Sequence, residues 1–442
     1  MRIWLKNPLA VLAEGADGGI VVDGAEIAEL VPRGGAPSAP VDETLDAGRH
    51  VILPGLVNAH HHFYQTLARA HPAGMRLDLV PWLVALYPIW ARMDERDLRL
   101  SVRVALAELL LSGCTTAADH HNLFPPGLEH SIDIEVEEAR AMGVRATITR
   151  GAMSFGVKDG GLPPDNVVQD DDAVLADCER VAKLYHDPAP GAMTRIAFAP
   201  CSPFAVHKPL MPDLAALAER LDVRLHTHFM QVEDEERFSV EAHGLRPVDF
   251  LESVGWLTSR VWLAHAVQFN PQDIARLGAA GVGVCHLAAA DMWLAAGICP
   301  VADFEAAGAP VGLGVDGSTS NDTSNMMEAV RHSLMLQRLR YGPRVTPYDA
   351  LRWATEGGAK CLGRDDIGAI APGARADLAL FTLEAPRFSG AQDPLAALVL
   401  CGAHRADRVM VNGVWRVVDG AVVGLDLDAL LAEHRQAARK FA

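Results

Sequence analysis

Short apolar runs alternate with stretches of helical spacing through the middle of the chain. Between the apolar runs, segments such as 95–111 and 212–221 repeat apolar residues every three or four positions. Repeated strand–helix units predict an α/β fold, a (β/α)₈ TIM-type barrel with its active site at the carboxyl ends of the strands. A doubly wound open sheet would need a glycine-rich phosphate loop, which the sequence lacks. We expect barrel strands over 55–60, 116–120, 145–150, 195–200, 224–228, 261–265, 281–286 and 311–316.

The two ends of the chain have a different pattern, with alternating apolar and polar positions and turn dipeptides. Asp23-Gly24 interrupts an apolar run near the start, and Asn412-Gly413 does the same near the end. These signals predict that the termini pair into one small β-sandwich. The expected domains are therefore 1–55 with 369–425 (the sandwich), 56–368 (the barrel) and 426–442 (a C-terminal helix).

Composition narrows the functional classes. The chain has 39 Lys and Arg against 56 Asp and Glu, a net charge of −17, and no basic run. This balance disfavours nucleic acids and acidic membrane surfaces as partners. No apolar run is long enough for a secretion signal or a membrane span, and the seven cysteines form no C-x-x-C pair. We expect a cytoplasmic protein without a disulfide framework or a cysteine zinc site.

Residues that can bind metal or move protons stand at the ends of four predicted strands. They are His60 and His62, the pair His226 and His228, His265, and Asp316. In an extended segment, side chains two positions apart project to the same side, so His60 and His62 can hold one ion. Only one member of the second pair, His226 or His228, needs to face the barrel mouth. Neutral imidazoles with one carboxylate suit Zn²⁺, or less often Fe²⁺, and such an ion activates water.

The motifs around these residues resemble, in order, those of the amidohydrolase superfamily, and in particular its cytosine/guanine deaminase and chlorohydrolase-like branch. They are PGLVNAHHH, SGCTTAADH, APCSPFAV, LHTH, VGLGVDGSTSND and APGARADLALF. The segment RGAMSFGVKDGGLPPDNVVQ, with CSPFAV after it, is most similar to the 8-oxoguanine deaminases. The resemblance implies a barrel with a β-sandwich from both termini, one divalent metal ion, and hydrolytic release of ammonia from an aromatic heterocycle.

The resemblance also implies roles for individual residues. The metal ligands would be His60, His62, His228 and Asp316, with His228 preferred to His226 because the family's ligand precedes its catalytic acid by three positions. Asp316 would take the proton of the attacking water, and His265 would stabilise the attacked centre. Substrate-pocket positions match Gln65, Ser202 and Phe204, although plain scaffold is the alternative for these three. A small heterocyclic substrate and a homodimer are the partners implied.

Two segments depart from the family pattern. Gln231 stands where the deaminases carry the glutamate that shuttles protons, and an amide cannot do this. Nearby Glu233, Glu235 and Glu236 lie at other offsets, and we expect them in the solvated first turn of a helix. After the seventh strand, in the loop 286–291, three alanines replace the small polar groups of the family's usual turn and a Trp follows, so we expect an emptier and more apolar wall of the substrate pocket.

Three accounts of function remain open. The favoured one is a heterocycle deaminase, acting on 8-oxoguanine or a guanine-like ring, whose native turnover is in doubt because of Gln231. The second is a metal hydrolase with an altered substrate or chemistry, such as an ester or halide leaving group, which needs less acid catalysis. The third is a non-catalytic metal-binding relative. The sequence decides neither between zinc and iron nor among purines, pterins and triazines.

Overall fold

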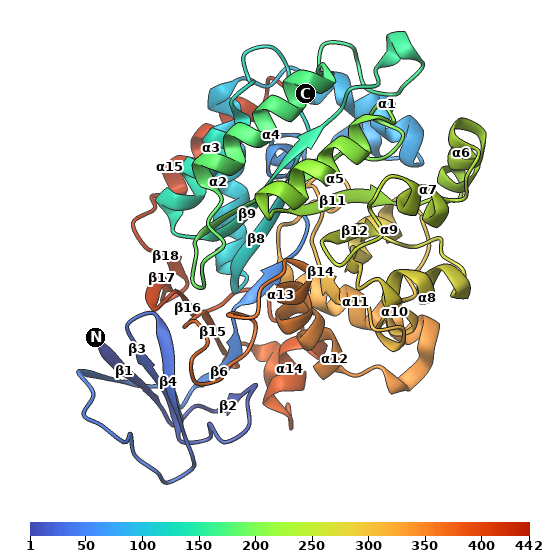
Figure 1. The fold of residues 1–442 in the computed structure, drawn as a ribbon. Helices are drawn as coiled ribbons and strands as arrows, with labels where there is room; N and C mark the ends of the chain where they lie inside the picture. Colours follow the sequence, from blue (N-terminus) through green and yellow to red (C-terminus); the bar gives the residue numbers. More distant parts are fainter.

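A closed barrel of eight parallel strands forms the centre of the molecule (Figure 1). The computed structural model describes all 442 residues. Several barrel strands are buried along their whole length, which is typical of parallel strands covered by helices. Around the barrel the strands are β7 Leu56–Asn58, β8 Cys114–His121, β9 Arg145–Ala152, β10 Thr194–Pro200, β11 Arg224–Phe229, β12 Val261–His265, β13 Gly283–His286 and β14 Val311–Leu313. The predicted α/β barrel is thus confirmed.

Strands from both termini build two further sheets at one end of the molecule, where Figure 1 shows the N-terminal strands beside those of the C-terminal part. Strand β6 pairs antiparallel with β15, so the two ends of the chain share one sheet. Apolar side chains from both sheets, among them Leu5 and Leu378, form a separate small core. The first sheet has the order β4 Glu26–Val31, β3 Gly19–Asp23, β1 Arg2–Lys6 and β5 Glu43–Asp46. The second has β18 Ala421–Val422, β17 Val414–Val418, β16 Arg408–Val411, β15 Leu378–Thr382, β6 His50–Pro54 and β2 Ala10–Val11.

Helices surround the barrel, and local sequence signals set where many of them begin. Asp94 and Asp97 form a reciprocal capping box at the start of α2, and Asn270 caps α8 ahead of Pro271. No helix is both long enough and apolar enough to cross a membrane. The helices are α1 Leu79–Trp90, α2 Glu95–Leu111, α3 Ser131–Met142, α4 Asp171–Tyr185, α5 Leu210–Leu221, α6 Asp234–His243, α7 Pro247–Ser253, α8 Pro271–Ala279, α9 Ala288–Trp293, α10 Val301–Ala306, α11 Met326–Tyr341, α12 Pro347–Arg352, α13 Gly358–Cys361, α14 Pro394–Leu400 and α15 Leu427–Ala438.

Two of the barrel strands are shorter than the apolar runs predict. Strand β7 ends at Asn58 and β14 ends at Leu313, so His60, His62 and Asp316 lie on the loops that follow. The strand-end loops are therefore what brings these side chains over the barrel mouth. The proposed domain boundaries stay a prediction.

Candidate active site

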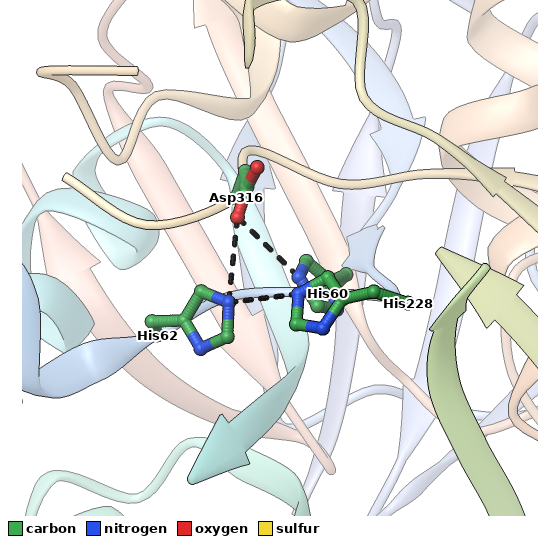
Figure 2. A group of neighbouring side chains, drawn as sticks. All are labelled: His60, His62, His228 and Asp316. Carbon is green, nitrogen blue, oxygen red and sulfur yellow. Dashed lines mark hydrogen bonds and ion pairs between the residues drawn. The ribbon is translucent and has the colours of Figure 1, made fainter. Parts of the chain in front are cut away.

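Three imidazoles and one carboxylate converge at the carboxyl ends of the barrel strands (Figure 2). The Oδ1 atom of Asp316 lies 3.3 Å from Nε2 of His60 and 3.6 Å from Nε2 of His62. Nε2 of His62 lies 3.1 Å from Nε2 of His228. His60, His62, His228 and Asp316 are therefore close enough to share one ion. His61, between the first two, turns away and contacts the Ser324 hydroxyl at 2.9 Å.

Backbone carbonyls fix which nitrogen of two of these histidines carries hydrogen. Nδ1 of His62 lies 2.7 Å from the carbonyl oxygen of His120, and Nδ1 of His228 lies 2.5 Å from that of Cys201. A carbonyl only accepts, so each Nδ1 must be the donor. In the neutral rings, Nε2 is therefore left as a lone pair directed into the cluster, as metal binding requires.

The tautomer of the third histidine, His60, is fixed by another histidine, His226, rather than directly by a backbone carbonyl. His226 Nδ1 donates to the Trp262 carbonyl at 2.7 Å, which leaves its Nε2 as an acceptor. That Nε2 lies 2.7 Å from Nδ1 of His60, so Nδ1 of His60 donates and its Nε2 is bare. The spacing left open which member of the 226/228 pair faces the mouth, and the resemblance favoured His228. The structure places His228 there and His226 behind His60.

The donor set fits a divalent metal ion. Nε2 of His60 is fully buried and has no hydrogen-bond partner, a costly arrangement that a cation would relieve. Burial lowers the pKa values of His60, His62 and His228, so these rings stay neutral near pH 7. Burial acts to raise the pKa of Asp316, but the neighbouring histidines outweigh it and keep the carboxylate ionised. Three neutral nitrogens and one anionic oxygen suit zinc or iron.

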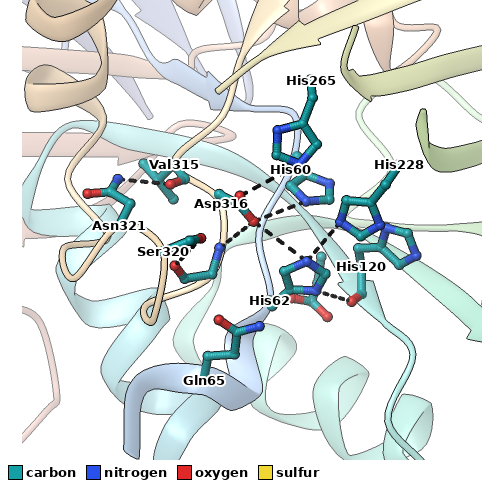
Figure 3. A network of polar contacts seen from close by, with 12 residues as sticks. His60, His62, Gln65, His120, His228, His265, Val315, Asp316, Ser320 and Asn321 are labelled. Carbon is teal, nitrogen blue, oxygen red and sulfur yellow. Dashed lines mark hydrogen bonds and ion pairs between the residues drawn. The ribbon is translucent and has the colours of Figure 1, made fainter. Parts of the chain in front are cut away.

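His265 stands beside this cluster, close to Asp316 (Figure 3). Its Nδ1 lies 2.8 Å from Oδ1 of Asp291, and its Nε2 lies 3.9 Å from Oδ2 of Asp316. Burial acts to lower the pKa of His265, but the charge of Asp291 and its hydrogen bond raise it above the ordinary value. In this His265 differs from His60, His62 and His228, whose pKa values are lowered.

The backbone at the site is strained. His265 and Asp316 have φ angles of 71° and 67°, and Met230, between His228 and Gln231, has 55°. Left-handed backbone at residues other than glycine is uncommon and costs energy, and it clusters at functional sites. Here it turns three strand-end loops sharply, so that the side chains of His265 and Asp316 face the cluster.

A cleft of about 540 Å³ opens over the cluster, and the other predicted site residues line it. Gln65, Ser202, Phe204 and Gln231 all reach its wall. The Ser202 hydroxyl and the Gln231 Nε2 are buried without hydrogen-bond partners. Aromatic residues close another wall, namely Tyr64, Trp82, Tyr87 and Trp90. The cleft thus combines flat apolar surfaces with a few unpaired polar groups, which suits a small polar ring.

One expectation about the acidic segment after β11 is wrong. Glu235 is not solvated but 9% exposed, and it lines the cleft. Its carboxylate accepts hydrogen bonds from the backbone N–H groups of Met230 at 2.7 Å, Gln231 at 2.8 Å and Val232 at 3.3 Å. The left-handed turn at Met230 aims these N–H groups at Glu235, which a helix pattern in the sequence does not reveal. Glu235 therefore fixes the backbone that carries Gln231.

The segment after β13 is a short helix rather than a turn that has only lost its polar groups. Residues 288–293 form the short helix α9, and Leu294, rather than the three alanines, lines the cleft. Asp291 lies inside the helix and is fully buried against His265. The sequence analysis gave Asp291 no role, and the signal that could have identified it was a charged residue in an otherwise apolar segment.

Comparisons with known proteins agree with this geometry. The model of the amidohydrolase family matches residues 51–416. The chain is 58% identical to 8-oxoguanine deaminase of Pseudomonas aeruginosa, over 99% of this chain and 98% of that protein. It is 38% identical to hydroxydechloroatrazine ethylaminohydrolase of Pseudomonas sp. strain ADP, over 92% of this chain and 88% of that protein. The zinc complex of atrazine chlorohydrolase from Arthrobacter aurescens superposes with a TM-score of 0.93 at 32% identity, covering 99% of this chain and 100% of that one.

Proposed function

Because the chain belongs to the amidohydrolase family, we propose that it is a metal-dependent deaminase that releases ammonia from 8-oxoguanine or a guanine-like heterocycle. The observation that carries the proposal is the convergence of three bare Nε2 atoms and the Asp316 carboxylate beside His265. The 58% identity to an 8-oxoguanine deaminase over nearly the whole chain favours this substrate class.

The roles follow from the geometry. A divalent ion, with zinc preferred, supplies positive charge that lowers the pKa of water to near neutrality. His60, His62, His228 and Asp316 would hold it. Oδ1 of Asp316 faces the ligand nitrogens, whereas Oδ2 faces His265. Oδ2 is thus free to take a proton from the attacking water, and Nε2 of His265 stabilises charge on the attacked centre.

The cleft would hold the ring. Its aromatic wall provides a flat apolar surface for a planar heterocycle. The Thr319 hydroxyl donates to the Gln65 amide oxygen at 2.5 Å, and the amide nitrogen makes only a long contact of 3.5 Å with the Tyr64 hydroxyl, so its second hydrogen is available for a ring carbonyl. We assign Gln65, Ser202 and Phe204 to substrate binding. Gln231 faces the same space and can hydrogen-bond a substrate, but its amide cannot shuttle protons.

The test is ammonia release from 8-oxoguanine, guanine, isocytosine and pterins by the zinc-loaded protein and by its Gln231→Glu variant, with metal content checked in both. Activity of the native protein on a purine supports the proposal. Activity of the variant alone would show a deaminase cleft impaired at Gln231. Inactivity of both with metal bound would refute deamination and leave a metal hydrolase with another leaving group or a non-catalytic metal-binding relative.

A metal hydrolase acting on a halide leaving group is a second candidate, which the similarity to atrazine chlorohydrolase favours. Chloride is a good leaving group and needs less help from a general acid than an amino group does. Chloride release from chlorinated triazines, measured beside ammonia release, separates the two activities. Chloride release without any ammonia release would favour this candidate.

A further inference from the structure

A second pocket, of about 800 Å³, opens at the amino ends of the barrel strands, opposite the metal cluster. Arg195 lies near the start of β10, Arg224 is the first residue of β11, and Arg260 immediately precedes β12. Because the barrel strands are parallel, these ends meet at one face, and all three residues line the pocket. Three guanidinium groups therefore gather at one place on a chain whose net charge is −17.

Arg224 is the least compensated of these groups. It is partly buried and forms no ion pair, and its Nε is buried without a hydrogen-bond partner. Its guanidinium carbon lies 5.8 Å from the centre of the Trp262 ring, a contact that satisfies no N–H donor. Burial lowers the pKa of Arg224 to about 10, and Arg260 and Arg195 act in the same direction, so the group is still charged at pH 7. A cation withdrawn from water without an acceptor is costly.

The other two arginines also keep free donors. Arg195 donates from Nη1 to the Gly363 carbonyl at 3.0 Å and from Nη2 to the Pro188 carbonyl at 2.9 Å. Its Nε is buried without a partner, and neutral carbonyls leave its charge unbalanced. Arg260 pairs with Asp222 at 2.8 Å through Nη1 alone.

The remaining titratable groups of the pocket do not balance these charges. Asp222 is already paired with Arg260, and Asp365 is exposed and forms no ion pair. Burial lowers the pKa of His186, which is therefore neutral at pH 7. Three cations thus face two carboxylates, and one of the carboxylates is taken.

We propose that this pocket is an anion site for a phosphoryl group, with Arg224 as its main donor and Arg195 and Arg260 beside it. The planar guanidinium fork matches the spacing of phosphate oxygens, and charge-assisted hydrogen bonds would satisfy the donors that the chain leaves free. A phosphoryl group has several oxygens and can accept from more than one of these arginines. The pocket lies at the opposite end of the barrel from the metal cluster, so the proposal is independent of the proposed deaminase function.

Calorimetric titration of the zinc-loaded protein with inorganic phosphate tests the proposal, with ionic strength held constant by sodium chloride. We expect saturable binding by the native protein. Arg224→Met keeps an apolar stem but removes the charge, and it should weaken this binding by about 10-fold or more, the loss expected for charge-assisted hydrogen bonds. No binding by the native protein would overturn the proposal. Equal binding by Arg224→Met would place the phosphate elsewhere, such as at the zinc, and would overturn it too.

Two further variants separate a local site from a general charge effect. Asp365→Asn removes a carboxylate from the pocket and should tighten phosphate binding by about twofold or more. Arg276→Met is the matched control, because Arg276 lies on α8 outside the pocket and pairs with Asp249 at 2.7 Å and Glu252 at 2.8 Å. It should leave phosphate affinity unchanged. Weaker binding by Asp365→Asn, or a loss in Arg276→Met as large as that in Arg224→Met, would overturn the proposal.

Stability without phosphate separates a ligand-binding group from a structural one. In chloride buffer, Arg224→Met should raise the urea midpoint of unfolding, because it removes a cation that has no partner. Added phosphate should raise the midpoint of the native protein but not that of the variant. A lower midpoint of the variant in chloride, together with an equal rise on phosphate addition in both proteins, would show a purely structural role and overturn the proposal.

Ribose 5-phosphate distinguishes the source of the phosphoryl group. Tighter binding of this ester than of inorganic phosphate, with the same dependence on Arg224, would support a phosphate ester as the ligand. Tighter binding of inorganic phosphate, with that dependence, would support the free ion. Inactivity of the protein as a deaminase would refute the proposed function and leave both results unchanged.

Discussion

Replacing His226 with phenylalanine removes the hydrogen-bond acceptor that holds His60 in its metal-binding form. Phenylalanine keeps a flat ring against Trp262, on which His226 stacks at 4.2 Å between centroids. Without the acceptor, the tautomer of His60 that carries hydrogen on Nε2 becomes favourable, because that hydrogen can be donated to Asp316 Oδ1, 3.3 Å away. Metal binding must then reverse this tautomer and leave Nδ1–H buried without a partner.

The size of the effect follows from that unpaired group. A buried donor left without its acceptor costs about 1–3 kcal/mol, and each 1.4 kcal/mol is about tenfold in affinity. We therefore predict that zinc affinity falls by about 5- to 150-fold, which overlaps the roughly 10- to 100-fold measured for partners of metal ligands elsewhere. The assay is competition for zinc with a chromophoric chelator at fixed pH.

The control substitution, His61→Asn, lies in the same region of the site. His61 sits between two ligands but contacts Ser324 and points away from the cluster, so His61→Asn should change zinc affinity by less than about threefold. Unchanged affinity in a folded His226→Phe variant would refute this role of His226. A loss in His61→Asn as large as that in His226→Phe would refute its specificity.

Three further predictions concern stability and the metal. Asp377→Asn should lower the free energy of unfolding in urea by about 3–5 kcal/mol, because it leaves Arg145 buried without its paired charge, 3.0 Å away in the native protein; a change under 1 kcal/mol would contradict this. Burial lowers the pKa values of His61, His226 and His286 to about 3, so the unfolded chain takes up protons first as pH falls below about 6.5. Metal-free protein should therefore lose about 2 kcal/mol per histidine between pH 6.5 and pH 5, and a thermal midpoint independent of pH in this window would contradict it. Removal of the metal with a chelator should abolish ammonia release and zinc should restore it; activity that survives chelation would exclude a metal mechanism.

Much of the fold could be predicted from the sequence, because barrel strands and helices each have their own periodicity. The ligands could be predicted as well, since His60, His62 and Asp316 follow the strands closely in sequence. The ends of β7 and β14 could not, because single backbone hydrogen bonds, such as that from Asp316 N–H to the His60 carbonyl at 3.1 Å, continue past the last regular strand pair. Local spacing locates an element, whereas the partner strands decide where it stops.

The contacts that hold the site residues in place could not be predicted from the sequence, for a related reason. His226 acts through His60, which lies 166 positions away along the chain. Asp291, in helix α9, contacts His265 at the end of β12, which lies 26 positions away along the chain. Glu235 is close in sequence to Gln231, but its burial depends on the left-handed turn at Met230. Partners that meet only through tertiary packing leave no periodic signal.

The most direct test of the account is the rate of ammonia release from 8-oxoguanine as zinc is added to metal-free protein. With one metal centre formed by His60, His62, His228 and Asp316, the rate should rise from zero and level off at one zinc per chain. Ammonia release without metal, or none at one bound zinc per chain, would contradict the account.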